Sequence, residues 1–128
     1  MRKSFLAFVF SALGFLAVAG PAFAHHGTAA YDLTKTVTVS GTVTEFRFLN
    51  PHVLVFWEVK DETGKVQLWS GERGGPNSAA RNGWNKNIIK PGDQVTISGR
   101  QSKNGTPTMV ISKIILNGKD ISGAGGDN

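Results

Sequence analysis

Alternating apolar and polar residues form the first clear pattern in the chain, beginning at Thr36. The segment TVTVSGTVTEFRF places its valines at odd positions up to Val43, a period typical of a half-buried β-strand. The phase then slips by one residue, because the two following phenylalanines occupy even positions. One extra residue near Thr44–Glu45 restores the register, so the pattern predicts a β-bulge there. Gly41 indicates a sharp bend, which a small barrel needs in order to close.

Four further strands follow from similar patterns. The segment VLVFWEVK is apolar on both faces, which indicates a central strand, and the turn DETG after it indicates a hairpin. A second turn, KPGD, has Pro and Gly in the order that a type II turn requires. The five expected strands cover residues 36–48, 53–60, 65–70, 94–100 and 108–116.

A short helix is expected between the third and fourth strands, in the segment GGPNSAARNGW. Pro76 suits the first helical position, and Gly83 suits the position after the helix, with Trp84 packing back onto it. Three strands, a helix and two strands is the element order of the OB-fold, a five-stranded Greek-key barrel. We therefore expect an all-β, OB-like barrel over residues 36–117. An SH3-like barrel or a small sandwich is the alternative.

Residues 1–24 have the layout of a secretory signal peptide. A basic start, MRK, precedes an uncharged and largely apolar run over residues 5–19, which is shorter than the roughly 20 residues of a membrane-spanning helix. The triplet AFA, ending at Ala24, provides small residues before the expected cleavage point. We expect a periplasmic or secreted protein with no stable membrane insertion after cleavage. Residues 25–35 are then an N-terminal arm, and the glycine-rich residues 118–128 a flexible tail.

Composition removes several classes of function. The chain has no cysteine, which excludes disulfides, a cysteine nucleophile and cysteine-ligated zinc or iron–sulfur centres. The net charge of +5 falls to +3 without Arg2 and Lys3, and the remaining basic residues form no stripe, so we expect no nucleic-acid partner. No serine or carboxylate has a spacing that identifies a catalytic group, so we expect a binding protein rather than an enzyme.

Two of the three histidines, His25 and His26, directly follow the expected cleavage point. Cleavage there makes His25 the N-terminal residue, whose α-amine and Nδ1 can chelate one metal ion. His52, in the loop after Asn50-Pro51, or His26 supplies a third nitrogen, and Asp32 an oxygen. Nitrogen-rich, square-planar coordination favours Cu(II) over Ni(II) and Zn(II). The leading hypothesis is a copper-type site, used for binding or, in a third interpretation, for redox catalysis. The alternative is a solvated arm and a turn histidine.

Aromatic and basic residues support a second, metal-free interpretation. Trp57 and Trp69 lie on either side of the expected hairpin, where cross-strand neighbours can form a stacking face for a ligand. Arg73 and Arg81 flank a glycine-rich connection that can hold an anion, although its spacing fits no known phosphate loop. The chain is then a periplasmic module that docks a ligand or a protein. The alternatives are tryptophans that fill the core and a plain connection.

Four segments of the chain resemble one family of short secreted bacterial proteins, known as a domain of unknown function. They are HHG…YD, GTVTEFRFLNPHV, GGPNSAARNGW and KPGDQVTISG, and together they span nearly all of residues 25–128. The resemblance implies an exported, single-domain, OB-like barrel. It implies no established activity.

Overall fold

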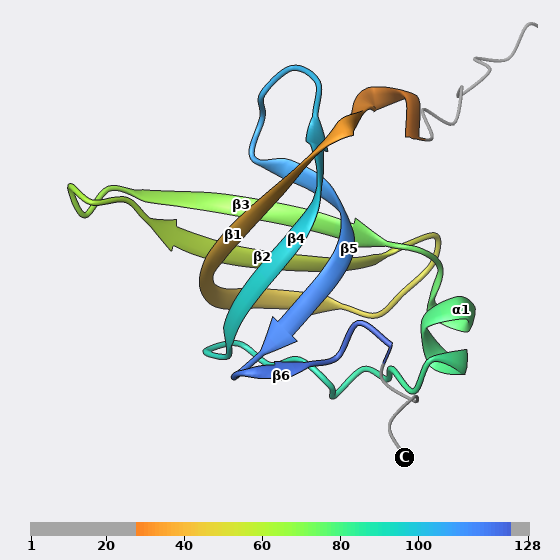
Figure 1. The fold of residues 1–128 in the computed structure, drawn as a ribbon. Coiled ribbons are helices and arrows are strands. Elements are labelled where there is room, and N and C mark those ends of the chain that lie inside the picture. The colour runs from red at the N-terminus through yellow and green to blue at the C-terminus, as the bar shows by residue number, and fades with distance from the viewer. Residues whose placement is uncertain (1–27, 124–128) are drawn as a thin grey trace, which may run out of the picture.

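The structure, a computed structural model, describes residues 28–123 (Figure 1). After a short 3-10 helix, η1, the chain forms long strands that wrap around one core, with one helix placed between β3 and β4. The elements are η1 (Thr28–Ala30), β1 (Tyr31–Arg47), β2 (Val53–Lys60), β3 (Val66–Arg73), α1 (Pro76–Arg81), β4 (Gln94–Ser102), β5 (Thr108–Leu116) and β6 (Lys119–Asp120).

Five of the strands close into a ring. Their order is β3-β2-β1-β4-β5, all neighbours being antiparallel, and a short parallel pairing of β3 with β5 joins the two ends. That pairing covers only Ser70–Glu72 of β3 and Thr108–Val110 of β5. The connectivity is that of the OB-fold, so the predicted fold class is confirmed.

The predicted bulge in β1 is confirmed. Val43 pairs with Trp57 and Glu45 with Phe56, so Thr44 is an extra residue opposite β2. The bulge lets β1 pair with two strands. Residues before the bulge pair mainly with β4, and residues after it pair only with β2. Gly41 lies just before this point. A Cβ there would overlap the Glu58 carbonyl oxygen and lie 3.0 Å from the Trp57 ring, so the close approach requires glycine.

The core is made of the inward side chains of all five ring strands together with four residues beyond them, Ala79, Trp84, Ile89 and Ile121. Trp57 and Trp84 are its largest fully buried members. The helix ends as predicted: Gly83 has φ +80°, and the amides of Gly83 and Trp84 donate to the carbonyls of Ala80 and Ala79. This cap turns the Trp84 indole into the open end of the barrel.

The strands run further than the sequence pattern indicates at both ends. β1 begins at Tyr31, inside the expected arm of residues 25–35. At the other end, β6 pairs with β5, and Ile121 is buried although it lies inside the expected flexible tail. The Ile121 amide donates to Ile114 at 3.0 Å, and its carbonyl accepts the Trp84 indole N–H at 2.8 Å. The packing of the barrel therefore continues beyond residue 117, as far as Ile121 at least.

Removal of the Ile121 side chain tests this C-terminal extension. We expect Ile121→Ala to lower the free energy of unfolding by about 2 kcal/mol, the lower end for a buried Ile because the site is at the barrel rim. Urea denaturation followed by tryptophan fluorescence measures the change. The exposed neighbour Lys119 is the control, and Lys119→Ala should change stability by less than about 0.5 kcal/mol. Equal effects of the two substitutions would contradict the assignment.

Three sequence predictions lie outside the described residues: the signal peptide, the pair His25 and His26, and the end of the tail after Gly123. Within residues 28–123, no helix combines the length and apolarity needed to cross a membrane.

Candidate functional site

His52 lies in the connection between β1 and β2, at the same end of the barrel as the end of β3 (Figure 1). Its side chain is 47% exposed, and its Nδ1 lies 3.5 Å from Oε2 of Glu72 on β3. The pairing of Leu54 with Glu72 explains the contact, since it brings the last outward residue of β3 beside the start of β2. A carboxylate next to Nδ1 favours a proton on that nitrogen and leaves the Nε2 lone pair available.

Tyr31 completes this cluster from the start of β1. Partial burial raises the pKa of its phenol, and the negative charge of Glu72 raises the pKa further. The phenol is therefore neutral at neutral pH and lies within electrostatic range of the Glu72 carboxylate. We name His52, Glu72 and Tyr31 the rim cluster. It combines one imidazole, one carboxylate and one phenol.

The rim cluster alone does not form a metal site. Among residues 28–123, no group of three or more His, Asp or Glu side chains is arranged to hold a metal ion. Asp32, the predicted oxygen ligand, is engaged locally: its Oδ1 accepts the Thr34 amide at 3.0 Å and the Thr34 hydroxyl at 2.6 Å. These hydrogen bonds, the hydroxyl's above all, lower the pKa of Asp32. The described residues therefore do not by themselves give His52 the partners of a metal site.

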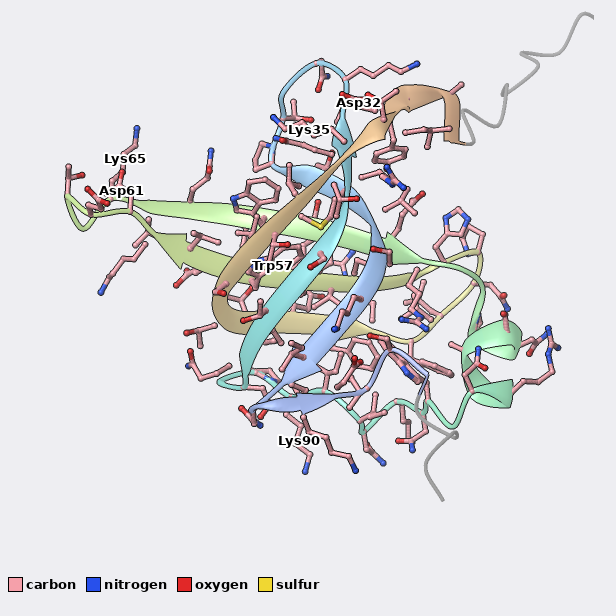
Figure 2. The ribbon with its side chains drawn as sticks, viewed as in Figure 1. Asp32, Lys35, Trp57, Asp61, Lys65 and Lys90 are labelled. Atoms are coloured by element: carbon pink, nitrogen blue, oxygen red, sulfur yellow. The ribbon has the colours of Figure 1, made fainter. Side chains whose placement is uncertain are left out.

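Trp57 and Trp69 are cross-strand partners, as the hairpin predicts, but they point into the barrel. Their rings stack with centroids 6.1 Å apart and planes 29° apart. Trp57, labelled in Figure 2, is 0% exposed and Trp69 is 9% exposed, so neither ring is open to a ligand. The predicted tryptophan stacking face is therefore corrected: both side chains belong to the core, because odd positions of β2 and β3 face inward.

Arg73 and Arg81 have separate surroundings. The Arg73 guanidinium lies over the Trp84 ring at 4.7 Å, and it donates a hydrogen bond to the Ser122 carbonyl. Its burial lowers the pKa of Arg73, and the charge of Asp120 acts in the opposite direction. Arg81 is exposed in the last turn of α1. Within residues 28–123 the two guanidinium groups share no hydrogen-bond partner, and Arg73 packs against the C-terminal segment.

The role of Glu72 and the outward face of β2 were not predicted from the sequence. Glu72 follows from the hairpin register, because pairing across the DETG turn places it beside Leu54 and thus near His52. Phe56 is the aromatic residue on the outer face of β2, and the Arg47 guanidinium lies 4.9 Å from its ring centroid. Since Phe56 and Trp57 are adjacent and both apolar, the pattern alone does not tell which faces outward.

Several solved structures are similar to this chain in the arrangement of their strands. The mitochondrial single-stranded DNA binding protein Rim1 of S. cerevisiae is 11% identical, with 64% of this chain and 92% of that chain covered and a TM-score of 0.49. The N-terminal domain of PriB from Thermoanaerobacter tencongensis, described as dimeric, is 23% identical, with 65% and 96% covered and a TM-score of 0.44. These TM-scores are below 0.5, and we draw nothing about function from them. No protein with curated annotation matches the chain.

One protein family matches most of the sequence. The model of a family of unknown function, DUF6152, matches residues 13–111, which include both His52 and Glu72 and run from before the arm into β5. The chain therefore belongs to the family DUF6152.

Proposed function

We propose that the protein is exported and, once cleaved after Ala24, binds one Cu(II) ion at its new N-terminus. The α-amine and imidazole of His25 form a chelate, His52 supplies a nitrogen from the barrel, and His26 assists. A site rich in nitrogen donors favours Cu(II) among the available divalent ions. The function is capture or carriage of the ion by a small barrel in the periplasm or outside the cell.

The observation that carries the proposal is the contact between His52 and Glu72. Metal-binding histidines usually have a carboxylate or carbonyl beside the second ring nitrogen, which fixes the tautomer and strengthens the other nitrogen as a ligand. His52 has this arrangement, with Nδ1 3.5 Å from Glu72 and the ring half exposed. The charge of Glu72 also adds to the effect of burial in raising the pKa of the Tyr31 phenol, at the start of β1.

Chain length supports the same grouping. His26 and His25 precede Thr28, the first described residue, by two and three positions. An extended chain spans at most about 3.5 Å per residue, so both histidines are tied within about 10 Å of Thr28. In the proposed site, the donors missing from the rim cluster come from this segment, which leads directly into β1.

Copper titration of the processed protein tests the proposal. We expect one equivalent of Cu(II) to produce a visible d–d absorption band that saturates at a one-to-one ratio. Mass spectrometry of the exported protein should give His25 as the first residue. A protein that begins at His25 and shows no band at one equivalent contradicts the copper site. Oxygen consumption in the presence of substrates then separates simple binding from the redox interpretation.

The part played by the barrel is tested at Glu72 and His52. We expect His52→Ala to weaken Cu(II) binding by about 10- to 100-fold, and Glu72→Gln by about 10-fold, since loss of an outer partner typically costs 10- to 100-fold. Glu45→Gln is the matched control, because Glu45 is an exposed carboxylate held by Arg47 at 2.6 Å on another strand. Equal copper affinity in His52→Ala and wild type would show that the site uses the N-terminal segment alone.

A further inference from the structure

The β2–β3 hairpin extends beyond the strands that flank it (Figure 1). β3 pairs with β2 along its whole length, from Val66 to Arg73, but its pairing with β5 starts only at Ser70. The first half of β3, residues 66–69, therefore has one free edge within the described part of the chain. Asp61 and Lys65 mark the tip of this hairpin, away from the body of the barrel (Figure 2).

The free edge has a defined set of backbone groups. Hydrogen bonding alternates along an antiparallel strand, so every second residue directs its N–H and C=O to the same side. The Asp61 amide donates to the Lys65 carbonyl at 2.9 Å, and the Ser70 amide donates to Pro107 at 3.0 Å. Odd residues of β3 thus face β2, and even residues face the other way. The open backbone groups on this edge are those of Val66 and Leu68.

The same two residues expose their side chains. Leu68 is 54% and Val66 47% exposed, and they are two of the four large apolar side chains that are so exposed in residues 28–123. A strand edge that combines open backbone groups with apolar side chains is a template for pairing with another strand. Charged residues that would block such an edge are absent from residues 66–69.

We propose that this edge pairs with the same edge of a second copy of the chain, giving an antiparallel β3–β3 dimer with two-fold symmetry. The two-fold axis passes beside Gln67, so Val66 of each copy lies opposite Leu68 of the other. Each of these pairs exchanges two backbone hydrogen bonds, which uses all the open groups of both residues. The two hairpins then form one continuous sheet across two barrels.

The neighbouring registers do not satisfy the same groups. An axis at Leu68 pairs Val66 with Ser70, whose amide already donates to Pro107. An axis at Val66 pairs Leu68 with Gly64 of the turn. In the register centred on Gln67, no like charges meet: Lys65 lies opposite Trp69, and Gln67 opposite its own copy. The register centred on Gln67 therefore satisfies all the open backbone groups of the two edges and brings no like charges together.

The short edge predicts a dimer that depends on concentration, because it buries less than the roughly 1,200 Å² of a standard stable interface. Sedimentation velocity of the full exported protein, with EDTA to exclude metal bridges, should show a weight-average coefficient that rises with concentration. Leu68→Lys should weaken the dimer at least about tenfold. Leu33→Lys is the matched control, since Leu33 is equally exposed on β1. A monomer at every concentration, or equal loss in the control, overturns the proposal.

Disulfide trapping tests the register. The chain has no cysteine, so one introduced cysteine can form a disulfide only between two copies. Opposed residues in a pair without hydrogen bonds have Cα atoms about 4.5 Å apart, which a disulfide tolerates. We expect Gln67→Cys to give a covalent dimer under mild oxidation at least about tenfold faster than Lys113→Cys on the exposed side of β5, as effective concentration predicts. Equal rates at the two sites overturn the proposed edge.

Discussion

An acetyl group on the α-amine of His25 should remove high-affinity copper binding. Acetylation converts this amine into an amide nitrogen, which no longer forms the chelate ring with the imidazole, and it adds no new amine. Both histidines of the arm, His52 and the whole barrel are unchanged. Since removal of an outer partner alone costs up to about 100-fold in affinity, we expect loss of this ligand to cost at least about 100-fold. Competition against a Cu(II) chelator of known affinity measures it.

The matched control for this experiment carries a blocking group at the other terminus. An amide in place of the α-carboxylate of Asn128 leaves the α-amine of His25 free, and this protein should bind Cu(II) as the wild type does. Both proteins should have the same melting temperature without metal, because the blocking groups lie outside the barrel. Equal copper affinity in the two blocked proteins would contradict the N-terminal chelate, even if His52 binds the ion by some other arrangement.

The strand pattern of the sequence predicts the fold because turns and alternation are local signals. Glycines at Gly64, Gly83 and Gly92 have positive φ at the three turns where the sequence places them. The extra residue at Thr44 follows from the phase of the phenylalanines, and the structure has the bulge there. With strand order and connection lengths set by these signals, closure of the ring through β3 and β5 is the remaining step, and the OB-fold supplies it.

The candidate site is harder to predict from the sequence than the fold, because it depends on contacts between residues that are far apart in the chain. Glu72 and His52 are 20 positions apart, and only the register of the hairpin brings them together. Ile121 likewise follows a glycine-rich turn that predicts a loose tail, yet its burial depends on the opening beside Trp84. These contacts have no period in the sequence, so neither alternation nor turn chemistry indicates them.

The orientation of the tryptophans is the error with the clearest physical reason. In VLVFWEVK both sets of alternating positions are apolar, so Phe56 and Trp57 are equivalent candidates for the core. The structure distinguishes them through β1, where the bulge at Thr44 turns Val43 and Phe46 inward to meet the odd positions of β2. A ligand-stacking face on Trp57 and Trp69 would require the opposite orientation.

Trp57→Ala should be among the most damaging single substitutions in the barrel. The indole is fully buried, stacks on Trp69 and packs against the backbone at Gly41. Truncation removes the buried surface of the indole. It leaves a cavity that the closed ring of strands cannot collapse to fill. We expect the free energy of unfolding to fall by about 3–5 kcal/mol, the range for buried large aromatic residues. Urea unfolding followed by circular dichroism measures the change.

Two neighbouring substitutions separate core packing from loss of an aromatic residue as such. Phe56→Ala, on the outer face of the same strand, removes a ring that is covered mainly by Arg47, and should cost about 1 kcal/mol. Trp57→Phe keeps a buried ring, and it removes an indole N–H that has no hydrogen-bond partner among residues 28–123, so its cost should stay well below that of Trp57→Ala. If Trp57→Ala instead left stability within about 1 kcal/mol of wild type, the indole would have to lie at the surface. The stacking-face interpretation would then be the correct one, because only an exposed ring can be lost at so small a cost.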